Sequence, residues 1–202
     1  MPRPASKVAD EVAARARSLN AYVDRLERLY GRRELGRPDL NRAYAGALIA
    51  FHTYVERSLE RLFLGLVMRR FTRTGVRPLV VINSERVARA VVNGGRRYVD
   101  WLPYEQLTLP RAEAFLSKGH PFVDLEKDDR RSLENLRVIR NALAHESSHA
   151  LRMFRQRFTE GKALPPDQVT PTGYLRGRHA GSQSRLAFML TDTVHVFARL
   201  CG

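Results

Sequence analysis

The sequence predicts an all-α fold. Long stretches place apolar side chains every three or four residues, the spacing that gathers them on one face of a helix. Glycines and prolines cluster between these stretches, where they end helices and begin turns. Only residues 71–82 are ambiguous, because their end, PLVVI, fits a short strand or an extended connection. We find no internal repeat and therefore expect one helical domain over residues 1–202.

Two long helices are expected in the amino-terminal part of the chain. Residues 6–30 repeat apolar side chains at helical intervals and stop at Gly31. Residues 40–70 predict a second helix, whose apolar stripe consists of Tyr44, Leu48, Phe51, Val55, Leu59, Leu62 and Leu66. Residues 1–5 precede the first helical pattern, and we expect them to be disordered.

The remaining elements are shorter until the motif region. Ser84 can cap a short helix that Gly94 and Gly95 end. Short helical turns are expected over 96–127, which are interrupted by Pro103, Pro110, Gly119 and Pro121. A long helix over 128–158 follows, then a loop over 160–181 and a terminal helix.

The charge of the chain favours a polyanionic partner. The sequence has 35 basic and 21 acidic residues, a net charge of +14, and only four of the basic residues are lysines. Guanidinium groups bind phosphate in a bidentate manner, so an arginine-rich surface favours RNA or DNA. A GC-rich genome that favours arginine codons would give the same composition.

The sequence disfavours membrane insertion, export and a disulfide framework. No apolar run approaches the roughly 18 to 20 residues of a membrane span. The start, MPRPASKVADEV, lacks the apolar core of a signal peptide. Cys201 is the only cysteine, which excludes an internal disulfide framework. We expect a cytoplasmic protein that does not associate with membranes.

One histidine belongs to two motifs. Residues 140–145, RNALAH, place an arginine, a polar residue and a histidine at the spacing of a metal-free ribonuclease site. Residues 145–149, HESSH, match the zinc-protease pattern H-E-x-x-H, in which both histidines bind the metal and Glu146 is the base. The extended zinc pattern fails, however, because Arg152 and Arg155 occupy its glycine and third-histidine positions. We therefore predict no metal and no cofactor and keep a zinc hydrolase as the weaker alternative.

Helix geometry separates two of the motif residues. At 100° per residue, Asn141 and His145 share a face, whereas the side chains of Arg140 and His145 leave the helix about 140° apart. The long arginine side chain could reach around the helix, or the helix could be distorted. We favour a third hypothesis, in which Arg140 and His145 come partly from two chains that meet across a two-fold axis.

The motif region resembles a known protein family. RNALAH, preceded by LENLRVI (133–139), is similar to the signature helix of the HEPN superfamily. The resemblance to RiboL-PSP-HEPN proteins extends over 98–122, 145–154 and 170–177, and the segment 48–63 is similar to the family's second helix. It covers roughly the last half of the chain in detail and most of the rest in outline.

The resemblance implies a HEPN-type bundle with two long antiparallel helices that dimerises through its motif helices. Many superfamily members are metal-independent endoribonucleases of toxin, defence or RNA-processing systems, and others only bind nucleotide, RNA or a protein. Carried over by position, Arg140, Asn141 and His145 would be catalytic. Glu56 would be an accessory acid, or alternatively an ordinary surface glutamate near Arg57 and Glu60. An RNA ligase, a phosphoesterase or an antitoxin is the implied partner.

The chemistry of the three residues agrees with RNA cleavage. Histidine can accept and donate protons near neutral pH, arginine stabilises phosphate charge, and an asparagine amide can orient the imidazole or the ribose. One histidine does not easily act as both base and acid, which again favours a homodimer. For RNA binding we predict Arg137, together with Tyr174, Arg176 and Arg178 of the glycine-containing stretch GYLRGRH (173–179), although that stretch could be an ordinary solvated loop. The alternative function is a non-catalytic HEPN module.

Overall fold

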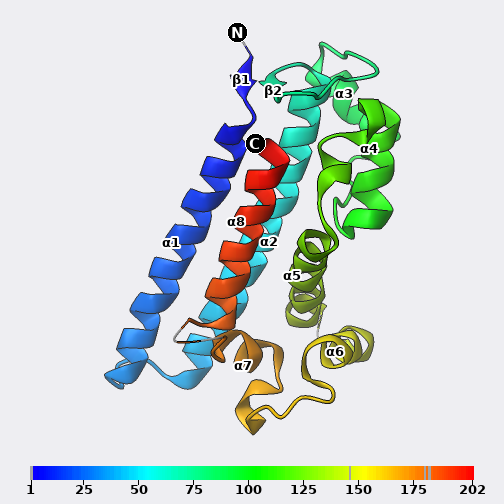
Figure 1. The fold of residues 1–202 in the computed structure, drawn as a ribbon. Helices are drawn as coiled ribbons and strands as arrows, with labels where there is room; N and C mark the ends of the chain where they lie inside the picture. The colour runs from blue at the N-terminus through cyan, green and yellow to red at the C-terminus, as the bar shows by residue number, and fades with distance from the viewer. Residues whose placement is uncertain (1, 146, 180, 182) are drawn as a thin grey trace. The chain divides into compact units, whose positions relative to one another are not determined.

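The all-α prediction is confirmed at the level of fold class. The structure, a computed structural model, describes residues 2–145, 147–179, 181 and 183–202, and most of these residues are helical (Figure 1). The α-helices are α1 (Ser6–Gly31), α2 (Arg37–Val67), α3 (Glu85–Val92), α4 (Leu109–Phe115), α5 (Lys127–His145), α6 (Ser148–Phe154), α7 (Pro171–Arg176) and α8 (Arg185–Cys201). Single turns of π-helix (η1, Tyr104–Thr108; η4, Arg155–Thr159) and of 3-10 helix (η2, Ser117–Gly119; η3, Phe122–Asp124; η5, Pro166–Gln168) complete the helical structure.

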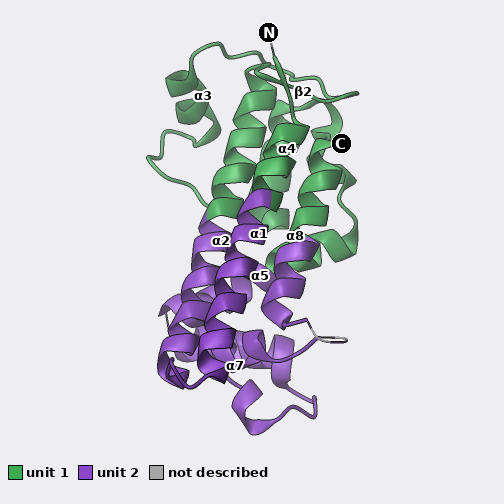
Figure 2. Ribbon diagram, turned by 90° about the vertical axis from the view of Figure 1, so that its left-hand side faces the viewer, with its two compact units in different colours: residues 1–13, 54–134, 193–202 green, residues 14–53, 135–192 purple. Residues whose placement is uncertain are grey.

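Contacts within the chain define two compact units (Figure 2). Unit 1 comprises residues 1–13, 54–134 and 193–202, and unit 2 comprises residues 14–53 and 135–192. The divisions fall inside α1, α2, α5 and α8, so each of these helices contributes to both units. The sequence does not predict this division, because the boundaries between the units coincide with no loop or linker.

The core of unit 1 is aromatic. The Phe63 ring on α2 lies 5.1 Å from Trp101, 5.6 Å from Phe122 and 6.0 Å from Phe115, measured between ring centroids. The buried hydroxyl of Tyr104 donates to the Phe122 carbonyl at 2.8 Å. These contacts hold the short turns of residues 96–124 against α2, and most of the α2 stripe predicted from the sequence is fully buried. In residues 96–124, packing against α2 therefore holds the chain in place without a long regular helix.

The long helix expected over 128–158 is wrong in one respect: it is interrupted. α5 ends at His145 and α6 begins at Ser148, while Glu146 lies outside the described residues. Ser147 has extended backbone angles (φ −71°, ψ 150°), and its hydroxyl accepts a hydrogen bond from the Ala150 amide at 3.2 Å. A serine that caps the following helix competes with continuation of the preceding one.

Two segments are more ordered than the sequence predicts. Residues 1–5 were expected to be disordered, yet β1 (Arg3–Pro4) pairs in parallel with β2 (Phe71–Thr72). The expected loop over 160–181 contains η5 and α7, because the Thr170 hydroxyl caps α7 by accepting from the Gly173 amide. None of the described helices combines the length and apolar character that crossing a bilayer requires.

Cys201 is expected to be unreactive in the folded protein. Its thiol is buried at the end of α8, and burial raises its pKa to about 12, so little of the reactive thiolate forms at neutral pH. Labelling with a disulfide reagent at about pH 8 should therefore be slow in buffer and rapid in denaturant. Fast labelling of the native protein would show that the end of α8 is not packed as described.

Candidate active site

Three predicted site residues meet at the end of α5. Arg140 Nη1 donates to Asn141 Oδ1 at 2.9 Å and lies 3.3 Å from His145 Nε2. All three residues belong to unit 2. Arg140 and Asn141 are half-buried, whereas His145 is exposed. The arrangement brings a fixed positive charge, an amide and a solvent-accessible imidazole together within one chain.

The termination of α5 explains how Arg140 reaches His145. On a continuous helix the two side chains would leave about 140° apart. His145 is the last residue of α5, and the side chain of Arg140 is long enough to cross the remaining angle. The contact forms without a second chain, so the geometric reason for assembling Arg140 and His145 from two chains is removed. The homodimer itself stays a prediction.

The contact also constrains the imidazole. Arginine can only donate, so an arginine hydrogen bond to His145 Nε2 needs a lone pair on that nitrogen. In a neutral ring the proton then lies on Nδ1. The Asn141 oxygen accepts from the same Nη1 atom of Arg140, and this leaves Nη2 for another partner. The site can therefore bind an anion through Arg140 Nη2 beside the His145 imidazole.

A small cavity adjoins these residues. It measures about 200 Å³ and is lined by Arg137, Val138, Asn141, His145, Ser147, His149, Ala150 and Met153, all from unit 2. His149 Nδ1 lies 3.2 Å from Arg152 Nη2, so a second imidazole at this cavity also contacts a guanidinium. Met153 is exposed and supplies an apolar side to the cavity. The predicted RNA-binding residue Arg137 thus lies beside the candidate catalytic residues.

The H-E-x-x-H alternative loses its helical geometry. His145 belongs to α5 and His149 to α6, with the extended Ser147 between them, so one uninterrupted helix does not carry both histidines. Glu146, the expected base, lies outside the described residues. The part of the chain that the structure describes contains no group of three His, Cys, Asp or Glu side chains suited to a metal.

His52 on α2 is a neighbour that sequence reasoning did not connect with the site. It is 4% exposed, and burial together with the positive charges of Arg140 and Arg137 lowers its pKa to about 4, from an ordinary value of 6.5. All three residues belong to unit 2. A neutral buried imidazole therefore lies near the guanidinium groups of α5. No sequence spacing links residue 52 to residues 137 and 140.

Replacement of His52 by glutamine should reduce the loss of folding stability at acidic pH. The folded-state pKa is depressed, so the unfolded chain binds the proton more readily, and stability falls as the pH drops from about 6.5 towards 4. Between about pH 7 and pH 4.5, protonation of His52 should lower the free energy of unfolding of the wild-type protein by about 2.5 kcal/mol. The His52→Gln variant should lack this contribution. Urea denaturation of both proteins at the two pH values measures the difference. Parallel profiles would contradict the burial of His52.

Glu56 has a structural role in unit 1. Its Oε1 accepts from the backbone amides of Trp101 and Leu102 at 3.2 and 3.3 Å. These bonds fix the chain where Trp101 enters the aromatic core. Glu56 is assigned to unit 1 and the motif residues to unit 2, so an accessory catalytic role for Glu56 stays a prediction.

The GYLRGRH stretch is not the free loop that the sequence suggests. Tyr174 lies in α7, where its ring packs against Phe154 and Phe158 at centroid distances of 5.9 and 5.0 Å. The Arg176 guanidinium lies 3.5 Å from the Glu27 carboxylate and 5.1 Å from the Tyr30 ring centroid. Only Arg178 of the three predicted RNA-binding residues here is exposed. Tyr174 and Arg176 therefore have packing partners in unit 2.

Comparisons of the chain with models of known protein families, with curated proteins and with solved structures find no match. The resemblance to HEPN proteins therefore stays an expectation from the sequence motifs, and the functional argument depends on the geometry at the end of α5.

Proposed function

We propose that the protein is a metal-independent endoribonuclease with Arg140, Asn141 and His145 as its catalytic residues. The observation that carries the proposal is the 3.3 Å contact between Arg140 Nη1 and His145 Nε2, beside an open cavity. It supports the proposal because a guanidinium, which can bind phosphate, lies next to an imidazole, which can transfer a proton. These are the two functions that RNA cleavage without a metal requires.

The reaction follows from the groups. The ribose 2′-oxygen attacks the adjacent phosphorus, its proton passes to a base, and the 5′-oxygen leaves with a proton from an acid. Arg140 stabilises the charge on the phosphorane, because a guanidinium keeps its charge and binds two oxygens at once. His145 transfers one of the two protons, and Asn141 holds Arg140 in position. The products are a 2′,3′-cyclic phosphate and a 5′-hydroxyl.

The second proton needs a second group. Two candidates fit the proposal: His149, which lines the same cavity, and His145 of a second copy in a homodimer. His149→Gln distinguishes them. A large loss of cleavage in this variant would favour His149, whereas full activity would favour the dimer.

The positive surface supports RNA as the substrate. The exposed residues Arg152, Arg155 and Arg157 follow the motif in α6 and η4, and Arg157 Nε donates to Asn135 on α5 at 2.8 Å. With a net charge of +14, the chain can attract a polyanion over distances of several ångström. An RNA-processing, toxin or defence setting and a ligase or antitoxin partner belong to the same proposal.

The test is cleavage of labelled cellular RNA in excess chelator. Cleavage should persist without metal, should leave 2′,3′-cyclic phosphate ends, and should stop at any position carrying a 2′-deoxyribose, because the nucleophile is then missing. The same preparation of a variant without the His145 imidazole controls for contaminating nucleases. Loss of cleavage on chelation, with release of stoichiometric zinc, would favour the zinc hydrolase. RNA binding without cleavage would favour the non-catalytic module.

A further inference from the structure

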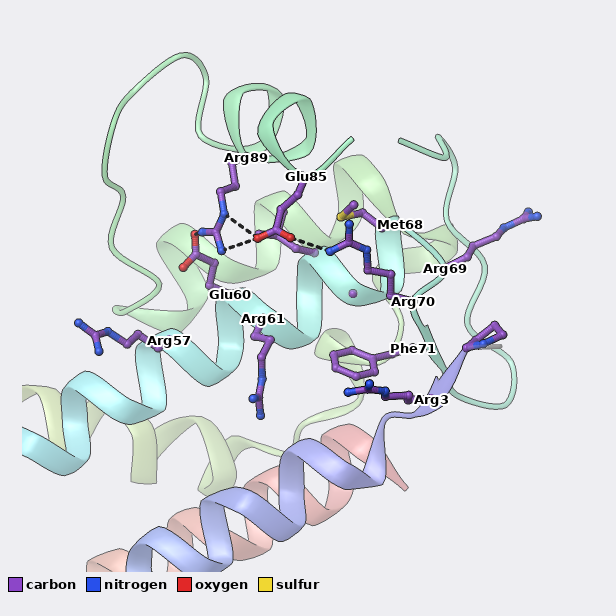
Figure 3. A pocket seen from close by; sticks show the side chains of 13 residues that line it. Arg3, Arg57, Glu60, Arg61, Met68, Arg69, Arg70, Phe71, Glu85 and Arg89 are labelled. Carbon is purple, nitrogen blue, oxygen red and sulfur yellow. Dashed lines mark hydrogen bonds and ion pairs between the residues drawn. The ribbon is translucent and has the colours of Figure 1, made fainter. Parts of the chain in front are cut away.

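A second cavity lies in unit 1, formed by α2, α3 and the β1–β2 pair. It measures about 870 Å³, within the range of small-molecule sites. Figure 3 shows the side chains around it, which include several arginines together with Met68 and Phe71. The lining residues are Pro2, Arg3, Arg57, Glu60, Arg61, Leu64, Gly65, Met68, Arg69, Arg70, Phe71, Glu85 and Arg89.

One side of α2 contributes both arginines and an apolar residue to the cavity. Arg57, Arg61 and Leu64 follow at intervals of four and three residues, which aligns them along one side of α2, and Met68 comes directly after the end of this helix. The cavity therefore combines cationic and apolar side chains, and Arg3, Arg69 and Arg70 add positive charge around Met68 and Phe71.

The strand pair places an aromatic ring and a guanidinium side by side. Arg3 and Phe71 are direct partners in the β1–β2 register, and partners in a ladder project to the same side. The Arg3 amide donates to the Arg70 carbonyl at 2.8 Å, which fixes this register. The Phe71 ring packs on Gly65, where a Cβ would overlap it. Figure 3 shows the Phe71 ring and Arg3 next to each other at the cavity.

The carboxylates of the cavity are already occupied. Glu85 bonds Arg70 at 2.6 Å and Arg89 at 3.2 Å, and Glu60 also bonds Arg89. Arg61 pairs with Glu11. Within the described part of the chain, Arg3 and Arg57 have no carboxylate partner. The cavity therefore keeps positive charge beside its aromatic side.

We propose that this cavity binds an organic phosphate of nucleotide size, with the phosphate at Arg3 and the arginines of α2 and a flat ring against Phe71. Several guanidinium groups match a multiply charged phosphate, and an aromatic side chain favours a planar ring. The volume accommodates both parts together. This site is separate in sequence from Arg140, Asn141 and His145, and it does not depend on RNA cleavage.

The test is calorimetric titration of the full-length protein with ADP, adenosine and pyrophosphate. ADP should bind, adenosine should bind much more weakly, and pyrophosphate should be weaker than ADP because it lacks the ring. Arg3→Gln should weaken ADP binding about tenfold or more, since it removes a charge-assisted hydrogen bond but no backbone pairing. Phe71→Leu keeps an apolar side chain over Gly65 and should also weaken ADP, while leaving pyrophosphate unchanged.

Arg86→Gln is the matched control, because Arg86 is exposed on α3 and does not line the cavity. It should bind ADP as the native protein does. No heat with ADP at millimolar concentration, or equal losses in Arg86→Gln and Arg3→Gln, would overturn the proposal. Citrate binding as tightly as ADP would overturn the phosphate assignment. A 5′-phosphorylated oligonucleotide that displaces ADP would identify a strand end as the source of the phosphate, and failure to displace it would identify a free nucleotide; both support the site.

Discussion

Replacement of His145 by alanine is expected to lower the rate of RNA cleavage by about three orders of magnitude. A positioned general acid or base contributes about 10² to 10⁴ to the rate, and His145 supplies the exposed imidazole that contacts Arg140. Stability should change little, because His145 is the exposed last residue of α5. Single-turnover cleavage and the melting temperature measure the two effects separately.

His195→Ala is the appropriate control, since His195 is an exposed histidine on α8. It should cleave RNA at the native rate. RNA binding by His145→Ala should persist, because the arginines remain. If His145→Ala retained more than about a tenth of the activity, the imidazole would not transfer a proton in the rate-limiting step, and the proposed mechanism would be wrong.

The long helices were predictable because their periodicity is uninterrupted. In α2 the stripe from Tyr44 to Leu66 repeats over many turns, and burial of that stripe outweighs any local preference. The break after His145 was not predictable, because the apolar pattern of α5 resumes in register at Ala150 and Phe154. Ser147 was the available signal: a serine before a helical run is also a cap, and its hydroxyl decides where α6 begins.

Part of the candidate site could be read from the sequence, since RNALAH identifies three residues that do meet. Contact between Arg140 and His145 within one chain depends on where α5 ends. The angles of an ideal helix do not predict that end. His52 lies 85 or more positions away from Arg137 and Arg140 along the chain, so only the fold relates its pKa to theirs. The unit 1 cavity was missed for the same reason, because Arg3 meets Phe71 only through strand pairing.

Tyr174 and Arg176 show that one local composition can have two explanations, and their RNA-binding role stays a prediction. An aromatic residue interleaved with arginines is typical of a nucleic-acid contact, but the same composition suits the packed end of a helix. The Tyr174 ring also has the Arg185 guanidinium 4.5 Å from its centroid, so both its aromatic and cationic neighbours come from the protein itself. Local composition cannot distinguish a ligand from an internal partner.

Replacement of Arg140 by lysine is expected to lower RNA cleavage by about 10² to 10³, although the positive charge is kept. Arg140 uses one nitrogen for both Asn141 and His145 and has further donors for the scissile phosphate. A lysine ammonium is a single point of charge that cannot hold these partners and two phosphate oxygens in one plane. Losing one preorganised donor to a developing oxyanion typically costs about 10² to 10³ in rate.

The Arg140→Lys result separates two explanations of the basic site. If charge alone matters, lysine should restore cleavage to nearly the native rate and both proteins should respond equally to added salt. If geometry matters, the variant should bind RNA almost normally but cleave slowly, so the loss appears in the single-turnover rate at saturating enzyme. Arg131→Lys, an exposed position on α5 that pairs with Asp128 at 3.2 Å, provides the matched change and should leave cleavage unaltered. Native activity in Arg140→Lys would remove the bidentate role from the mechanism and leave Arg140 as one charge among many.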